Sequence, residues 1–122
     1  MTVKVGQETV MCIQIYEWIK NRTELEGSCF HFANEGKRSY FNASMLKKMG
    51  FKAGASDYFF SRPNKAYSGL WIEVKDSGKK PTKVQRDFMN RMLMDGYYAT
   101  WFDSVDAVIA CIKDFYSIED LP

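Results

Sequence analysis

Hydrophobic and polar positions follow two kinds of spacing along this chain, and each kind predicts a different element. Segments 57–60 and 69–75 are rich in the aromatic and β-branched residues that suit strands. The stretch between them is polar and contains Pro63, Asn64, Ser68 and Gly69, which favour turns. We therefore predict an antiparallel hairpin. Segment 28–33 has a similar strand-like composition and predicts a further strand.

Helices are predicted in four other segments, of which three precede the final strand and the last follows it. Segment 6–20 has a broad apolar face and predicts a largely buried first helix. Segment 42–50 predicts a short helix with Asn42 as its cap and Gly50 as its end. Segment 83–95 follows Thr82, a favourable N-cap, and ends at Gly96. Its predicted inward-facing residues are Val84, Phe88, Met92 and Leu93.

The last two elements complete the predicted fold. Segment 97–102 has strand composition, and a helix connects it to the strand at 69–75, so the two strands should be parallel. Ser104 begins a final helix whose core face carries Val105, Val108, Ile109, Ile112 and Tyr116. The order of elements predicts one α/β domain over residues 1–122, a mixed β-sheet flanked by helices on both sides.

Candidate chemistry lies on the predicted hairpin. Because side chains alternate along a strand, Glu73 and Lys75 emerge on the same face and Val74 points the other way. If the strands pair so that Asp57 lies near Glu73, two carboxylates and an ammonium group converge. Hard cations such as Mg²⁺ prefer oxygen ligands of this kind. An acid and a lysine two positions apart are also common in surface salt bridges. This motif alone therefore does not distinguish a catalytic site from a surface salt bridge, and the surrounding sequence must be considered.

The context resembles a known family. The matching segments are GASD at 54–57, WIEVK at 71–75, Gln85, GYY at 96–98 and HFANEGKRS at 31–39. Together they are similar to the VRR-Nuc family of the PD-(D/E)XK nuclease superfamily, and to its small stand-alone, often phage-borne members. The resemblance extends from about Glu8 to Tyr116. It implies a restriction-endonuclease-like α/β fold. One departure is Ser56, which stands where the superfamily motif has proline.

The resemblance also implies roles for single residues. It makes Asp57 and Glu73 ligands of Mg²⁺ or Mn²⁺, with the backbone carbonyl of Val74 as a further ligand. Lys75 would assist the attacking water, and Gln85 would support the lysine or a phosphate. The family also places a metal-site carboxylate on the first helix. Glu8 is the better match for it, and Glu17 is the alternative.

Charge is segregated along the chain although the net charge is only +2. Residues 35–91 hold thirteen Lys and Arg against five acids, a balance of +8, whereas the flanks have a balance of −6. A basic centre around a carboxylate pair suits a metal-dependent enzyme that acts on a polyanion, although solvated surface charge is the simpler alternative. The predicted DNA contacts are Asn34, Glu35, Lys37, Arg38, Lys79, Lys80, Lys83 and Arg86.

Two functions are compatible with these residues. The first is a metal-dependent DNA endonuclease, which the family resemblance makes selective for Holliday-junction-like or branched DNA. The alternative is a non-catalytic DNA-binding module of the same fold that acts with a partner. Nineteen aromatic residues exceed what one small core can bury, and together with the resemblance they predict a homodimer. A monomer with tyrosines on its surface is the other possibility.

The remaining features limit the other functional classes. Three cysteines without a CxxC pattern argue for reduced thiols and against a zinc site, and we expect Cys12 and Cys111 to be buried. No segment is long and apolar enough to cross a bilayer, so we expect no membrane partner and a cytoplasmic location. The family resemblance implies that the cell is bacterial or phage-infected. The lone histidine, His31, is expected to be a packing residue, because no nucleophile and acid accompany it.

Overall fold

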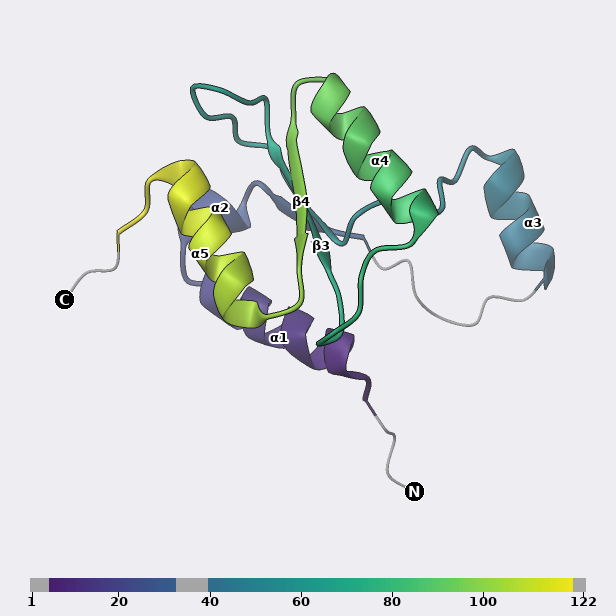
Figure 1. Cartoon of the computed structure of the whole chain (residues 1–122), viewed down its shortest axis with the longest axis horizontal. Coiled ribbons are helices and arrows are strands. Elements are labelled where there is room, and N and C mark those ends of the chain that lie inside the picture. The colour runs from purple at the N-terminus through teal and green to yellow at the C-terminus, as the bar shows by residue number, and fades with distance from the viewer. Residues whose placement is uncertain (1–4, 33–39, 120–122) are drawn as a thin grey trace.

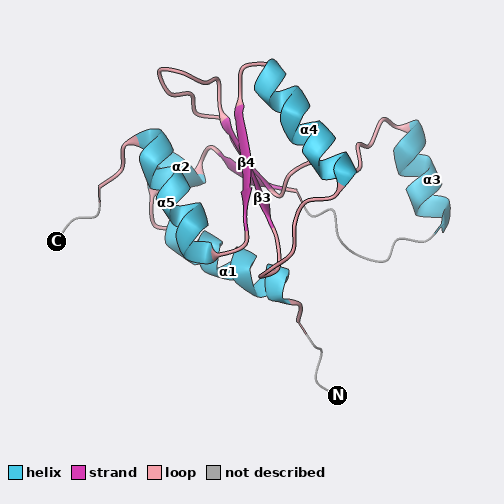
Figure 2. Ribbon diagram, in the orientation of Figure 1, coloured by secondary structure: helices cyan, strands magenta, loops and turns pink. Residues whose placement is uncertain are grey.

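The computed structural model describes residues 5–32 and 40–119. In chain order the elements are α1 (Gln7–Ile19), α2 (Thr23–Glu26), β1 (Cys29–His31), α3 (Tyr40–Lys48), β2 (Tyr58–Phe60), β3 (Leu70–Val74), α4 (Lys83–Met94), β4 (Tyr98–Phe102) and α5 (Val105–Tyr116). The strands form one sheet in the order β1-β2-β3-β4, with helices around it (Figures 1 and 2). The predicted mixed α/β architecture is confirmed.

Strand pairing agrees with the predictions from sequence. Strands β2 and β3 form the antiparallel hairpin, with Tyr58 opposite Ile72, and β1 adds to β2 in antiparallel orientation. Strand β4 pairs with β3 in parallel, with Ile72 opposite Thr100. A parallel neighbour requires a crossover connection, and α4 supplies it. The hairpin and the parallel crossover are both confirmed.

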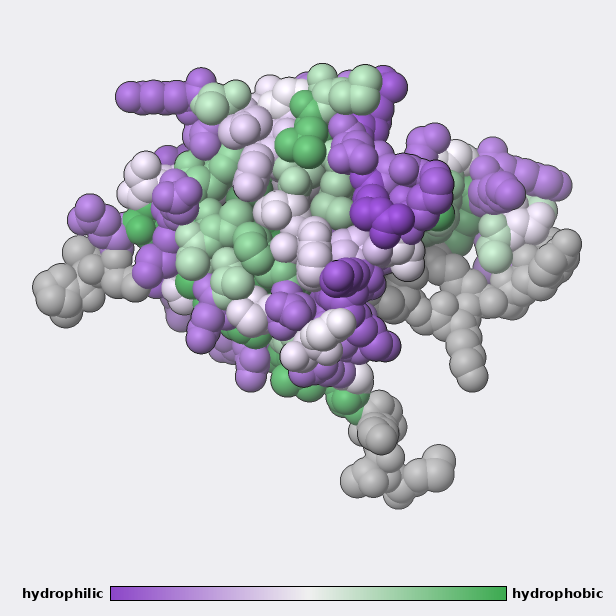
Figure 3. Space-filling view, in the orientation of Figure 1, coloured by the Kyte–Doolittle hydropathy of each residue, from purple (hydrophilic) through white to green (hydrophobic). Residues whose placement is uncertain are grey.

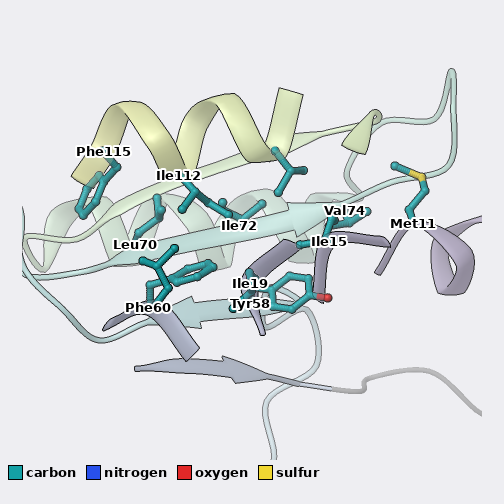
Figure 4. Packing of buried hydrophobic residues seen from close by; sticks show 12 residues of the cluster. Met11, Ile15, Ile19, Tyr58, Phe60, Leu70, Ile72, Val74, Ile112 and Phe115 are labelled. Carbon is teal, nitrogen blue, oxygen red and sulfur yellow. The ribbon is translucent and has the colours of Figure 1, made fainter. Parts of the chain in front are cut away.

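The main core lies between one face of the sheet and the helices α1 and α5. Leu70, Ile72 and Val74 alternate along β3 and are fully buried there. They pack with Ile15 and Ile19 of α1 and with Val108, Ile112 and Phe115 of α5 (Figure 4). The intervening β3 positions, Trp71 and Glu73, belong to the opposite face. The ring of Phe88 in α4 contacts Trp71 there at a centroid distance of 4.9 Å.

Helix α1 is amphipathic and not largely buried, so that prediction is wrong. Met11, Ile15 and Ile19 recur every four residues and are buried. Val10 and Ile13, by contrast, are 41% and 56% exposed. The sequence shows that these residues are apolar, but only one face of the helix meets the sheet and α5. The other face carries apolar side chains to the surface.

Helix α4 also differs from its predicted packing. Its buried residue is Met89, and Phe88 and Met92 are partly buried, whereas Val84 and Leu93 are exposed. The predicted inward orientation of Val84 and Leu93 is therefore wrong. The helix packs against β4 along a narrow stripe, which leaves its flanking apolar positions outside. Its predicted start is confirmed, because Thr82 caps it.

Smaller predictions have mixed outcomes. Helix α3 begins at Tyr40, so Asn42 lies inside the helix and is not its cap. Gly50, with φ +94°, follows the end of that helix, and Ser104 caps α5. No disulfide joins the three cysteines within the described residues, and all three are only partly buried, which corrects the expectation for Cys12 and Cys111. No helix in the described part of the chain has the length and apolar character that a membrane span requires.

Candidate functional site

Two buried carboxylates meet at one end of the hairpin. Since Tyr58 lies opposite Ile72, the register brings Asp57, just before β2, beside Glu73 in β3. Asp57 and Glu73 are 4% and 3% exposed. The backbone amide of Val74 donates a hydrogen bond of 2.7 Å to Oδ2 of Asp57. The antiparallel pairing that the sequence predicted is therefore what brings the two acids together.

A third carboxylate comes from the first turn of α1. One carboxylate oxygen from each of Glu8, Asp57 and Glu73 lies within 4.8 Å of the other two. Glu17, the alternative on the same helix, is exposed and forms an ion pair with Lys20 at 2.8 Å. The structure thus brings Glu8, and not Glu17, to the hairpin carboxylates.

The electrostatics of this acidic cluster suit a divalent cation. Oε2 of Glu73 is buried and has no hydrogen-bond partner among the described residues. Burial raises the pKa of Glu73 to about 8, and the charge of Asp57 adds to the shift, with Lys75 opposing it and Glu8 reinforcing it. A cation held by these oxygens would relieve both the desolvation and the repulsion. The donor set contains only oxygen, which favours a hard cation.

Lys75 is held beside the cluster by a residue from α4. Its Nζ donates to Oε1 of Gln85 at 3.2 Å. The same Oε1 accepts the backbone amide of Thr82 at 2.9 Å, and the Thr82 hydroxyl accepts the backbone amide of Gln85 at 3.3 Å. These reciprocal bonds form a capping box. The glutamine therefore starts the helix and contacts the lysine with one oxygen atom.

The site opens into a cavity of about 270 Å³. It is lined by Glu8, Phe51, Ala53, Gly54, Ala55, Asp57, Glu73, Lys75 and Gln85. Gly54 has φ +85°, and a Cβ built on it would lie 2.6 Å from Cγ1 of Val84 and 2.9 Å from the Val84 backbone oxygen. Only glycine fits this approach, by which the chain before β2 packs on the first turn of α4.

The predicted DNA contacts are only partly covered by the structure. Lys79 and Lys80 lie in the turn after β3, and Lys83 and Arg86 lie in the first turns of α4, all of them exposed. Three of them have partners: Lys83 pairs with Asp87, Lys79 lies 3.8 Å from Asp76, and Arg86 donates to the carbonyl of Pro81. Hydrophilic side chains gather over α4 in Figure 3. The other predicted contacts, Asn34, Glu35, Lys37 and Arg38, lie outside the described residues.

Several features of the site were missed in the sequence, and one prediction about it stays open. The reciprocal bonding of Thr82 and Gln85 was not predicted, although the Thr82-x-x-Gln85 spacing is a recognisable capping-box pattern. No sequence pattern indicates that the Val74 amide donates to Asp57 or that Phe51 lines the cavity. The Val74 carbonyl as a metal ligand stays a prediction. His31 lies outside the acidic cluster, with its ring 4.8 Å from that of Tyr58.

Comparisons with known proteins agree with this geometry. No protein-family model matches the chain, and no curated protein matches it either. A solved structure described as a "VRR_NUC domain protein" superposes with a TM-score of 0.81 and 26% sequence identity, covering 98% of this chain and 96% of that one. The likeness confirms the resemblance found in the sequence. The chain therefore shares the fold of a VRR_NUC domain protein along nearly its whole length.

Proposed function

We propose that this protein is a divalent-metal-dependent endonuclease that hydrolyses phosphodiester bonds in DNA. The observation that carries the proposal is the cluster of Glu8 with the buried Asp57 and Glu73, in which one carboxylate oxygen from each lies within 4.8 Å of the others, beside a lysine held by Gln85. A structural salt bridge would not need a third carboxylate or an unpaired buried oxygen. The likeness to a VRR_NUC domain protein supports the same class of activity.

Each residue of the site has a definable task in this reaction. Asp57, Glu73 and Glu8 supply the oxygens that would hold Mg²⁺ or Mn²⁺, and the Val74 amide fixes the orientation of Asp57. The bound cation would polarise the scissile phosphate and favour ionisation of a water molecule. Lys75, directed by Gln85, presents an ammonium group to the water or to a phosphate oxygen at the same place.

We further propose that the working unit is a homodimer that acts on branched DNA of the Holliday-junction type. An isologous pair would present two copies of the acidic cluster to two strands of a symmetric junction. Exposed apolar side chains on α1 support an interface between copies, because Val10, Ile13 and Tyr16 are each more than 40% exposed. Light scattering at micromolar concentration tests this, since a particle of 14.2 kDa would refute the dimer.

The main experiment compares wild type with Asp57→Asn, Glu73→Gln and Glu17→Gln. Each protein is incubated with plasmid, duplex, flap and four-way-junction DNA in Mg²⁺, Mn²⁺ or EDTA, and Mn²⁺ binding is measured by calorimetry. We expect the first two variants to lose both Mn²⁺ binding and cleavage. Glu17→Gln removes a carboxylate from the same helix as Glu8 but outside the cluster, so it should keep both.

Four results would contradict the proposal in whole or in part. Cleavage in EDTA, or full activity of Asp57→Asn and Glu73→Gln, would refute the assignment of these residues to a metal site. DNA binding without cleavage under every condition would indicate a non-catalytic DNA-binding module instead. Equal cleavage rates on duplex, flap and four-way junction would remove the selectivity for branched DNA while leaving the nuclease activity in place.

A further inference from the structure

The sheet face that carries the two carboxylates also carries a set of aromatic rings. The register places Phe30, Phe59 and Trp71 opposite one another across β1, β2 and β3. All three belong to the same face as Glu73, which follows Trp71 by two residues. Phe32 joins them from the end of β1. We refer to Phe30, Phe32, Phe59 and Trp71 as the aromatic face.

The rings of the aromatic face are mutually oriented. Phe59 stacks on Trp71 with ring centroids 4.4 Å apart and an interplanar angle of 27°. Phe32 also stacks against Trp71, with ring centroids 5.7 Å apart, and Phe30 stacks against Phe59 at 6.4 Å. The three interplanar angles lie between 25° and 27°. The rings thus present nearly parallel planes in a short series.

Part of this face is open to solvent. Phe30 is 50% and Phe32 is 40% exposed, whereas the apolar residues on the opposite side of β3 are fully buried. Helix α4 lies on this side of the sheet against β4, and it reaches Trp71 through Phe88. Exposed phenylalanines that lie together on a soluble domain mark a binding surface more often than a structural one.

The aromatic face is continuous with the acidic cluster. The amide of Phe32 donates to the carbonyl of Asp57 at 2.7 Å, so this ring belongs to the strand position beside the metal-site aspartate. Along β3 the two residues from Trp71 to Glu73 span roughly 7 Å, about the rise of two stacked nucleotides. A strand whose phosphate lay at the carboxylates would place its neighbouring bases over these rings.

We propose that the aromatic face binds unpaired nucleobases of the strand whose phosphate lies at the acidic cluster. The inference rests on the proposed nuclease function and narrows its substrate to DNA with a single-stranded segment beside the cleaved bond. Paired bases are stacked within the duplex and leave no face for these rings. Aromatic side chains on an open sheet are a recurrent platform for unpaired bases, and such stacking tolerates any sequence.

A second copy of the chain is the other possible occupant, and the position of the face argues against it. The strand positions of Asp57 and Glu73 lie directly beside Phe32 and Trp71. A second copy seated there would approach the acidic cluster, which must stay open for a polyanion. The exposed apolar residues of α1, across the sheet from this face, offer a contact that leaves the cluster free.

Binding in EDTA, where no metal-dependent cleavage occurs, tests the proposal. The probes are a fluorescein-labelled single-stranded oligonucleotide, an abasic strand of the same length, and the corresponding duplex, read by fluorescence anisotropy. The variants are Phe30→Leu and Phe32→Leu, which keep apolar area but remove the ring. Met94→Leu is the matched control, because Met94 is an apolar residue at the C-terminal end of α4, outside the aromatic face, and it is 79% exposed.

We expect each phenylalanine variant to weaken binding of the single strand by roughly fivefold or more, with no change for the abasic strand. Met94→Leu should bind all three probes like wild type. An equal loss on the abasic strand, or no loss on either, would overturn the proposal. The thermal unfolding temperature of each variant should match that of wild type. If a leucine variant is destabilised, Phe32→Trp is measured instead, and because it keeps an aromatic ring it should retain binding of the single strand.

Further outcomes distinguish this proposal from the dimer and from the nuclease function. If a Phe30→Ser, Phe32→Ser double variant converts a dimer into a monomer by light scattering, a second copy covers the face and the proposal is wrong. Base-dependent binding by a protein that never cleaves DNA would refute the nuclease function while supporting the aromatic face. Cleavage by a protein whose binding does not depend on the bases would support the nuclease function and refute the role of the aromatic face.

Discussion

The backbone amide of Val74 holds Oδ2 of Asp57 at 2.7 Å, while Glu73, the residue directly before Val74, has a buried oxygen without a partner among the described residues. The two carboxylates are therefore unlike, although they sit side by side. Asp57 receives a donor that stabilises its charged form, whereas Glu73 is desolvated beside that charge and has a pKa of about 8. Without a cation, Glu73 is the member of the pair that keeps its proton.

This asymmetry predicts a pH-dependent stability in metal-free buffer. The unfolded chain releases the Glu73 proton near its ordinary pKa of 4.5, but the folded chain keeps it to about pH 8. The folded state thus binds more protons across this range, and the free energy of unfolding should fall as pH rises from about 4.5 to 8. Glu73→Gln lacks this loss, so at pH 8 it should be more stable than wild type by roughly 1–3 kcal/mol.

Denaturant unfolding in EDTA at pH 5 and pH 8 measures the difference. The two proteins should be close at pH 5 and diverge at pH 8. Addition of Mn²⁺ at a hundred times its dissociation constant should then stabilise wild type by about 2.7 kcal/mol and leave Glu73→Gln nearly unchanged. A variant that is less stable than wild type at both pH values would contradict the desolvation of Glu73.

Lys75→Met should impair turnover much more than DNA binding. It is one of thirteen cations in the basic centre, so its loss changes the general attraction for DNA little. Among those that the structure describes, it alone is bonded to Gln85 beside the carboxylates. Single-turnover cleavage and anisotropy measured on the same DNA separate the two effects. A drop in affinity equal to the drop in rate would instead make Lys75 a phosphate anchor.

Thr82→Ala should lower the cleavage rate through Gln85. Removal of an N-cap costs about 1 kcal/mol of stability, and here it also frees the glutamine that contacts Lys75. Ser104→Ala is the matched control, since Ser104 caps α5 and accepts from Ala107 away from the site. Both variants should lose similar stability, but only Thr82→Ala should lose rate, and Thr82→Ser should restore it. Equal rates in the two alanine variants would show that the cap is purely structural.

DNA binding should weaken steeply with salt. If about four to six phosphates are neutralised, affinity should fall on the order of a hundredfold between 50 and 200 mM salt. Lys80 makes no ion pair within residues 5–32 and 40–119, so Lys80→Gln should reduce the slope of log affinity against log salt by about one. Lys20→Gln removes an exposed lysine of α1 that is paired with Glu17 and should leave the slope unchanged. A flat salt dependence would argue against a polyanionic substrate.

The sequence was sufficient for those parts of the fold that depend on local pattern. The alternation at 69–75 and the turn residues before it predicted the hairpin, and the helix between two strands predicted the parallel pairing of β4. The hairpin is the feature that brought Asp57 to Glu73. Glu8 could be placed only through family resemblance, because its approach to Glu73 depends on how α1 crosses the end of the sheet.

Tertiary packing explains what the sequence could not predict. Apolar residues of α1 and α4 were expected inside, yet Ile13 and Val84 are exposed, because each helix contacts the sheet along one narrow stripe. Composition identifies apolar residues but does not say how many faces of a helix are covered. The parallel rings of Phe32 and Trp71 were equally hidden, since they arise from strand register and not from sequence spacing.

One wall of the cavity can form only because Gly54, which packs closely against Val84, has no Cβ atom. The chain before β2 and the first turn of α4 are in contact at this glycine, so they form a single rigid boundary around Asp57 and Gln85. A methyl group there would press on Cγ1 and on the backbone carbonyl of Val84, and because the backbone cannot yield as a side chain can, the strain would move the wall outward. Gly54 is thus a determinant of site shape with no chemistry of its own, and the neighbouring aspartate would be displaced without being mutated.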